Sequence, residues 1–68
     1  MTTYNPAPLV RHVERNGHGT QKRVARAAGV SQQTMVKLVT PPADYVPSMR
    51  TVVAVAAAIG AAPMEFWR

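Results

Sequence analysis

The stretch that decides the fold runs from Thr20 to Val39 and reads TQKRVARAAGVSQQTMVKLV. Its apolar residues recur at helical spacing on both sides of Gly29, which predicts two short helices joined by a tight turn. Gly29 follows the first helix, where a left-handed residue commonly ends a helix and glycine adopts that conformation without steric cost. Thr20 and Ser31 are the expected N-caps, because their hydroxyls can accept a backbone N–H bond in the first turn.

Each of the two predicted helices has one apolar and one polar face. The residues expected to face inward are Gln21, Val24, Ala25, Ala28, Val30, Met35, Leu38 and Val39. Ala25 is small, which suits the close approach of a neighbouring helix, whereas Lys22, Arg23 and Arg26 are expected to be solvated. An amphipathic helical hairpin with solvated polar faces is the simplest interpretation of this pattern.

The outward face of the second helix carries the chemistry of interest. Gln33 and Lys37 point directly away from its apolar side, with Gln32 and Val36 beside them. Glutamine can form two hydrogen bonds with adenine, lysine can donate to guanine or to a phosphate, and valine can contact the methyl group of thymine. A short helix, a sharp turn and a second helix with polar outward side chains is the geometry that places side chains in the DNA major groove. Together with Gly29 and the small Ala25, this favours a DNA-binding unit.

The segment resembles the helix-turn-helix of the phage Cro/repressor family, also called XRE-type regulators. TQKRVARAAGVSQQTM resembles the two-helix unit, and PSMRTVVAVAAAIGAAPMEFW resembles the following segment, in which Pro-Ser opens a helix, a small-residue run ends at glycine and a short last helix follows. The resemblance implies a single all-α domain over residues 1–68, a compact bundle of about five short helices with its helix-turn-helix at about 20–39. The chain departs from the family at Val39-Thr40-Pro41-Pro42, where many relatives have a polar stretch, and at Ala62, where relatives often have a serine cap.

The resemblance also implies roles for individual residues. In the family, the positions of Gln32, Gln33 and Lys37 meet base edges and that of Gln21 contacts a phosphate; we add Val36 to the base contacts. The expected phosphate contacts are Gln21, Thr20, Lys22, Arg26 and Thr34. The partner implied is double-stranded operator DNA, bound by a homodimer on a palindromic site.

Composition is consistent with a nucleic-acid partner. Sixty-eight residues allow one small domain, and 8 Lys and Arg against 3 Asp and Glu give a net charge of +5, which favours a polyanion. Charge alone does not separate nucleic acid from an anionic membrane surface. Six of the eight basic residues precede Leu38, on the half that carries the predicted helix pair.

The flanking segments predict the remaining elements. Asn5-Pro6 is expected to begin a helix that continues to about Arg15, after a loose N-terminal arm. Residues 40–47 contain three prolines and are expected to form a loop. Ser48 is expected to cap a fourth helix that ends at Gly60, and Pro63 to open a last short turn. The main buried stripe expected in the fourth helix is Met49, Val52, Ala56 and Ile59.

Other classes of function find little support. His12 and His18 are the only histidines and a zinc site needs three or four ligands, so we expect no metal and no cofactor. Three acids, no cysteine and no glycine-rich phosphate motif argue against an enzyme. The longest apolar run is much shorter than the roughly 20 residues that span a bilayer, and the N-terminus has no charged leader before an apolar stretch. We expect a cytoplasmic protein of a bacterium or of a phage-infected host cell, with no membrane partner and no small-molecule ligand.

Two alternatives concern the partner. Phe66 and Trp67 either complete the core or form a dimer contact, since aromatic residues serve well as interface anchors. The predicted function is a sequence-specific transcriptional regulator. The first alternative is an antitoxin that binds both an operator and a toxin, with the Phe66–Trp67 end masked by that toxin. The second is an interaction module that does not bind DNA.

Overall fold

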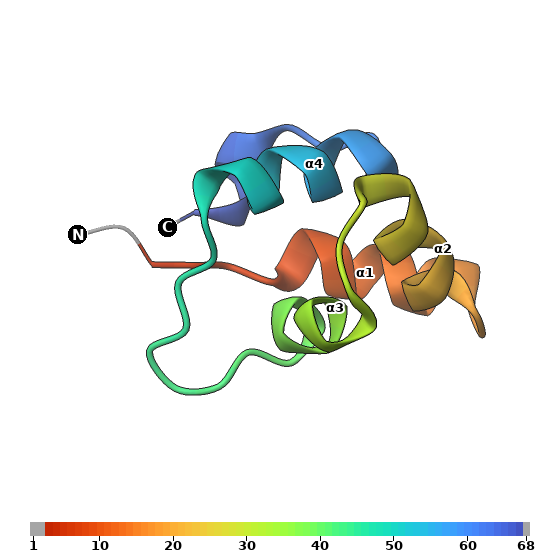
Figure 1. Cartoon of the computed structure of the whole chain (residues 1–68). Coiled ribbons are helices and arrows are strands. Elements are labelled where there is room, and N and C mark those ends of the chain that lie inside the picture. Colours follow the sequence, from red (N-terminus) through yellow and green to blue (C-terminus); the bar gives the residue numbers. More distant parts are fainter. Residues whose placement is uncertain (1–2, 68) are drawn as a thin grey trace.

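The computed structural model describes residues 3–67, and all regular secondary structure in that range is helical (Figure 1). Its elements are α1 (Ala7–Asn16), α2 (Thr20–Ala28), α3 (Gln32–Val39), α4 (Met49–Ile59) and the 3-10 helix η1 (Pro63–Phe66). The prediction of a small all-α domain is therefore confirmed. The last short turn expected at Pro63 is a 3-10 helix, so the described residues have four α-helices and one 3-10 turn where about five short helices were expected.

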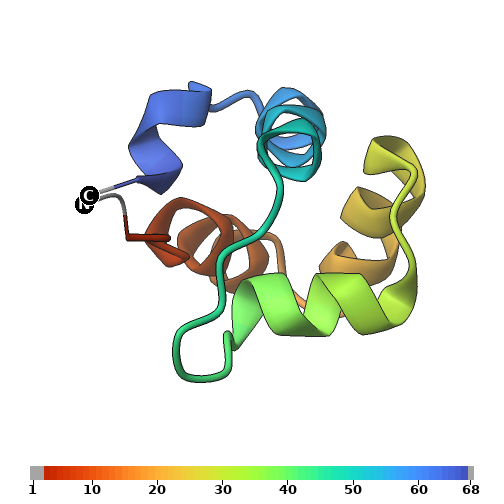
Figure 2. The ribbon, with the colours of Figure 1, turned by 60° about the vertical axis from the view of Figure 1, so that its left-hand side comes forward.

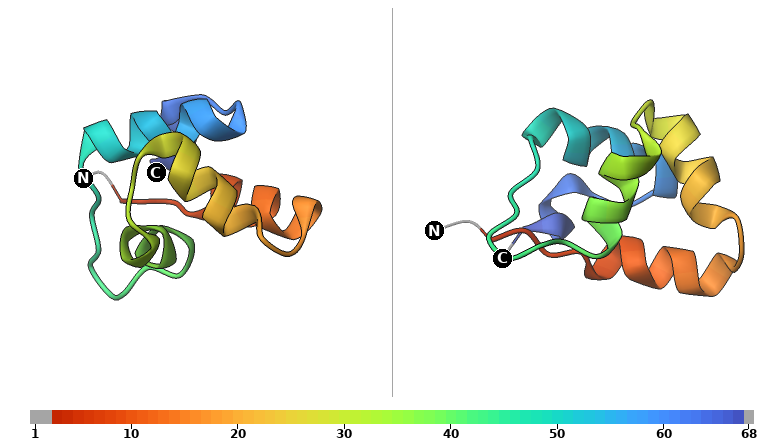
Figure 3. Two further views of the ribbon diagram at one scale, coloured as in Figure 1. Left: turned by 45° about the vertical axis from the view of Figure 1, so that its right-hand side comes forward. Right: turned by 60° about the horizontal axis from the view of Figure 1, so that its bottom comes forward.

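Helix α1 lies in the middle of the bundle, with other helices on two opposite sides of it. The α4 helix packs against α2 and η1, whereas α3 contacts only α1 and α2 among the helices of residues 3–67. Figures 1 and 2 show α4 and η1 on one side of the molecule and α3 on the other, with α1 between them. Figure 3 shows the segment that follows α3 leaving the bundle before it returns to begin α4. The outward surfaces of α3 and of α4 with η1 therefore point in opposite directions.

The core largely follows the predicted helical faces. Its largest fully buried side chains are Leu9, Met35, Leu38, Val52, Val55 and Phe66. Val24, Ala25 and Ala56 are buried as expected. Met49 is not: it is 58% exposed, because it lies at the free end of α4, and Val55 completes the stripe in its place. Residues 52, 55, 56 and 59 then follow the spacing of one helical face.

Two helix starts differ from the prediction. The N-cap position of α1 is Pro6, although the Asn5 side chain still accepts a bond from the backbone N–H of Ala7 at 3.1 Å. Thr20 is the first residue of α2 and not its cap; Gly19 takes the cap position in a left-handed conformation. The Thr20 hydroxyl donates to the carbonyl of Gly17 at 2.6 Å instead. No side chain caps α2.

The N-terminal arm is part of the core at Tyr4, contrary to the expected loose segment. Tyr4 is 6% exposed, pairs with Trp67 in an antiparallel bridge and stacks on Phe66. Its hydroxyl donates to the carbonyl of Leu38 at 2.7 Å. The part of this arm formed by Met1 and Thr2 lies outside the described residues. Within residues 3–67, no helix is long and apolar enough to cross a membrane.

Candidate nucleic-acid interface

The turn between α2 and α3 fixes the direction of α3. Gly29 has φ 71° and ψ 30°, so it ends α2 in the left-handed conformation expected for it. The backbone N–H of Val30 then donates to the carbonyl of Ala25 at 2.9 Å, and the Val30 side chain packs against the core. Ser31 caps α3 as predicted, because its hydroxyl accepts the backbone N–H of Thr34 at 3.1 Å. These contacts hold α3 on the bundle through its N-terminal end.

The four residues expected to contact bases lie together on the outward surface of α3. Gln32, Gln33, Val36 and Lys37 are all exposed, and Val36 is 50% exposed. Residues 32 and 36, and likewise 33 and 37, are one helical turn apart, so the four side chains form two adjacent rows. The opposite side of α3 is anchored by the buried Met35 and Leu38. The helix therefore presents amide, ammonium and methyl groups on one free surface.

The charge on the α2–α3 unit is positive, although Glu14 of α1 lines a hollow beside Gln32. The segment from Thr20 to Val39 has four basic residues, Lys22, Arg23, Arg26 and Lys37, and no acidic one. Lys22, Arg26 and Lys37 are exposed. A polyanion approaching α3 therefore meets attractive charges and no carboxylate within this unit.

The residues expected to contact phosphates do not all have free side chains. Lys22 and Arg26 are exposed, Gln21 is partly buried, and the Thr34 hydroxyl accepts a bond from Ser31 at 2.9 Å. Thr20 is 2% exposed. Because its hydroxyl is also committed to Gly17, the structure argues against a phosphate contact by the Thr20 side chain. The other four stay predictions.

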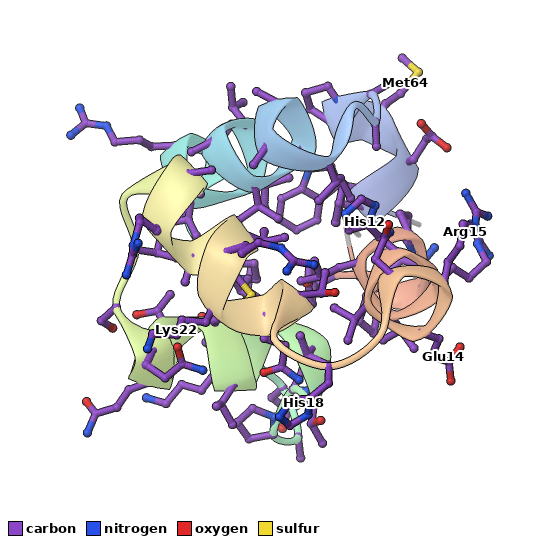
Figure 4. The ribbon with its side chains drawn as sticks, turned by 90° about the vertical axis from the view of Figure 1, so that its right-hand side faces the viewer. His12, Glu14, Arg15, His18, Lys22 and Met64 are labelled. Atoms are coloured by element: carbon purple, nitrogen blue, oxygen red, sulfur yellow. The ribbon has the colours of Figure 1, made fainter. Side chains whose placement is uncertain are left out.

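An open hollow of about 450 Å³ lies where the start of α2 meets the start of α3. It brings together Gln21, Lys22 and Gln32, and adds His18 from the loop between α1 and α2 and the acidic Glu14 from α1. Figure 4 shows His18 and Lys22 on the same side of the molecule as α3. Sequence reasoning missed His18 at this edge, because only the loop conformation at the two flanking glycines brings it there. Within residues 3–67, no side chain caps α2, and the backbone N–H of its first residue, Thr20, donates to the carbonyl of Gly17 at 3.3 Å.

Not every basic residue belongs to this surface. Figure 4 shows Arg15 on the outer side of α1, away from α3. The guanidinium of Arg23 donates to the Thr20 hydroxyl at 3.4 Å and borders a hollow that His12 and Ala58 also line. The basic half of the sequence therefore divides over more than one face, so we restrict the candidate interface to the residues beside α3.

The C-terminal aromatic pair has two different environments. Phe66 is 1% exposed and completes the core, which is the first of the two alternatives expected for it, so its side chain is not free for the dimer contact of the second. Trp67 is partly buried and packs edge-on against Tyr4 at 6.0 Å between ring centroids, and its buried indole N–H has no hydrogen-bond partner among residues 3–67. The two aromatic residues differ in burial because Trp67 forms the backbone bridge with Tyr4, and the residue before it, Phe66, then points inward.

Within residues 3–67, no group of three or more His, Asp or Glu side chains is placed to hold a metal ion.

Comparison of the chain with family models, with curated protein sequences and with solved structures finds no match. The function proposed for the chain therefore rests on its residues and their arrangement.

Proposed function

We propose that this chain is a sequence-specific transcriptional regulator that inserts α3 into the major groove of operator DNA, in the manner of Cro/repressor helix-turn-helix proteins. The observation that carries the proposal is the outward surface of α3, where Gln32, Gln33, Val36 and Lys37 are exposed side by side. Eight helical residues extend about 12 Å, and the major groove of B-DNA is wide enough to admit them. Each well-formed bidentate contact to a base contributes about 1–3 kcal/mol of discrimination.

Affinity would come from the positive charge beside α3. Lys22, Arg26 and Lys37 are exposed on a unit without carboxylates, so their contacts to phosphates would release counterions from the duplex. The first turn of α2 has no side-chain cap, and the N-terminal end of a helix favours a phosphate oxygen through its dipole. Binding at an operator then regulates transcription without any chemical step by the protein. This function places the protein in the cytoplasm of a bacterium or a phage-infected cell.

Methylation interference tests the groove. Dimethyl sulfate methylates guanine N7, which lies in the major groove, so a fragment methylated at a contacted guanine should be depleted from the bound fraction. We expect depletion at one or two guanines within a short site. Uniform recovery of all methylated fragments, from a pool that the protein binds, would contradict a reading of the major groove.

A further inference from the structure

The loop between α1 and α2 fixes the backbone on both sides of His18. The backbone N–H of Gly17 donates to the carbonyl of Val13 at 2.9 Å, and the buried hydroxyl of Thr20 donates to the carbonyl of Gly17 at 2.6 Å. Gly17 and Gly19 have φ 79° and 85°, a conformation that glycine adopts without steric cost. The side chain of His18 is exposed. The loop therefore presents one imidazole to solvent from a defined position.

His18 opens onto the hollow at the start of α2 and α3 together with three other polar side chains. Lys22 supplies an ammonium group, and Gln21 and Gln32 supply amides. Figure 4 shows His18 and Lys22 on the side of the molecule that carries α3. Among residues 3–67, none of these four side chains forms a hydrogen bond or an ion pair. Their donors are therefore available to a ligand in the hollow, whose volume is about 450 Å³.

The net charge of this hollow depends on His18. Two other charged groups line it: the ammonium of Lys22 from α2 and the carboxylate of Glu14 from α1, both exposed. Helix α3 adds only the uncharged Gln32. With a neutral imidazole, the positive and the negative charge offset each other, whereas with a protonated imidazole the hollow is positive. Histidine changes its charge between about pH 5 and pH 8, where lysine and glutamate side chains keep theirs.

A phosphate is the anion that suits such a site. A protonated imidazole and an ammonium group donate charge-assisted hydrogen bonds to phosphate oxygens. The hollow adjoins Gln32 at the start of α3, so the DNA strand that borders the occupied groove would pass beside it. We propose that the hollow binds a phosphate of this strand when His18 is protonated, and that DNA binding therefore takes up a proton. The site rests on the proposed function and gives it a dependence on pH.

Binding of a fluorescently labelled duplex of random sequence tests the role of His18. Measured by anisotropy, the wild type should bind about tenfold more tightly at about pH 5.5 than at about pH 8, because a charge-assisted contact is gained. His18→Gln should lose this gain. His12→Gln is the matched control and should keep it, since His12 lines two other hollows beside α4. Equal gains in the wild type and in His18→Gln would overturn the proposal.

His18→Lys separates the charge from any other property of the imidazole. Lysine stays protonated up to about pH 10, so this variant at about pH 8 should bind within about threefold of the wild type at about pH 5.5. It should gain no further affinity as the pH is lowered. A His18→Lys variant that binds at the higher pH no more tightly than His18→Gln would contradict a site that works through positive charge.

The salt dependence distinguishes a direct phosphate contact from an indirect effect of pH. At about pH 5.5, the slope of log binding constant against log salt should be steeper by about one in the wild type than in His18→Gln. At about pH 8 the two proteins should have equal slopes, because neither has a charge at this position. A gain in affinity at the lower pH without a change of slope would overturn the phosphate contact.

Glu14 tests the place of the phosphate. Among residues 3–67, its carboxylate is the only one that lines the hollow, so Glu14→Gln should tighten binding about twofold at about pH 8. Glu65→Gln is the matched control, because Glu65 lies in η1 on the opposite side of the molecule from α3; its affinity should equal that of the wild type. Equal effects of the two substitutions would overturn the placement of the phosphate in this hollow.

The same titrations separate the failure of this site from the failure of the proposed function. A duplex that binds with no gain at the lower pH removes the phosphate site at His18 and leaves α3 as the element that reads bases. A duplex that does not bind at either pH removes both.

Discussion

The hydroxyl of Tyr4 completes the C-terminal end of α3. In a continued helix, the carbonyl of Leu38 would accept the backbone N–H of residue 42, but Pro42 has no N–H. Tyr4 donates to that carbonyl at 2.7 Å from a distance of 34 residues in the chain. A residue from the N-terminal arm therefore fixes the helix that carries the candidate base contacts.

Tyr4→Phe should reduce the free energy of unfolding by about 1–3 kcal/mol, because it leaves a buried carbonyl without a partner. Chemical denaturation monitored by far-UV circular dichroism measures the change. Tyr45→Phe is the control, since Tyr45 is only partly buried and packs edge-on against Tyr4 by its ring. A Tyr4→Phe variant as stable as Tyr45→Phe would contradict the assigned role of the hydroxyl.

The same residue predicts a pH dependence. Burial, and less strongly the neighbouring Tyr45, raises the pKa of the Tyr4 hydroxyl above its ordinary value near 10. Above pH 10 the unfolded chain loses the Tyr4 proton while the folded chain keeps it. The contribution of this hydroxyl to the free energy of unfolding is therefore complete below pH 10 and decreases above it. The difference in unfolding free energy between wild type and Tyr4→Phe should shrink by about 1.4 kcal/mol at pH 11. Urea denaturation at pH 9 and 11 measures it, and a constant difference would contradict the prediction.

Arg26 and Arg15 provide a matched pair for the electrostatic part of the account. Both are exposed arginines, but Arg26 lies on α2 and Arg15 on the outer side of α1. If Arg26 makes the phosphate contact proposed for it, Arg26→Ala should lower the slope of log binding constant against log salt by about one on any duplex. Arg15→Ala should leave the slope unchanged. Equal slopes for the two variants would place Arg26 away from the DNA.

The roles of some single residues could be predicted from the sequence, and those of others could not. Gly29, Ser31 and Ser48 could be predicted, because each acts on backbone groups within a few positions of itself. Tyr4, Met49 and Phe66 could not, because their burial depends on which distant element covers them. Thr20 has the chemistry of a cap but lies one position too late, since Gly19 adopts the left-handed conformation before it.

At the scale of the helix, α3 and α4 begin with the same device. Ser31 and Ser48 accept the backbone N–H of Thr34 and Thr51 at 3.1 and 3.2 Å, and in each pair the two hydroxyl oxygens lie 2.9 Å apart. Both caps are exposed, but the residues directly before them, Val30 and Pro47, are at least partly buried, so capping and packing act together at these helix starts.

Ser31→Ala and Ser48→Ala should each lower the free energy of unfolding by about 1 kcal/mol, through loss of the cap. Only Ser31→Ala should also weaken DNA binding, because fraying at Gln32 and Gln33 misplaces the candidate base contacts. Thermal denaturation and fluorescence anisotropy on one duplex separate the two effects. Loss of DNA binding in both variants to the same degree would show that global stability, and not the start of α3, controls binding.

At the scale of the whole molecule, two surfaces of different chemistry lie on opposite sides of a thin bundle. The outward side of α3 is polar and positive, whereas the opposite side carries the exposed Met49 and Met64 beside a hollow that is lined by apolar residues. The helix content could be predicted, because the spacing of apolar residues and the Gly, Pro and Ser residues at helix starts and ends are local features of the sequence. The opposition of the two surfaces could not, because it follows from α1 lying between α3 and α4 with η1.

The central claim, that α3 reads base pairs, is tested most directly by selecting bound sequences from a random duplex pool. The enriched duplex and a scrambled duplex are then titrated with the wild type and with Gln33→Ala at two salt concentrations. We expect one short enriched motif, a loss of about 1–3 kcal/mol in binding free energy for Gln33→Ala on that motif, and no change on the scrambled duplex. An unenriched pool, or equal losses on both duplexes, would contradict it.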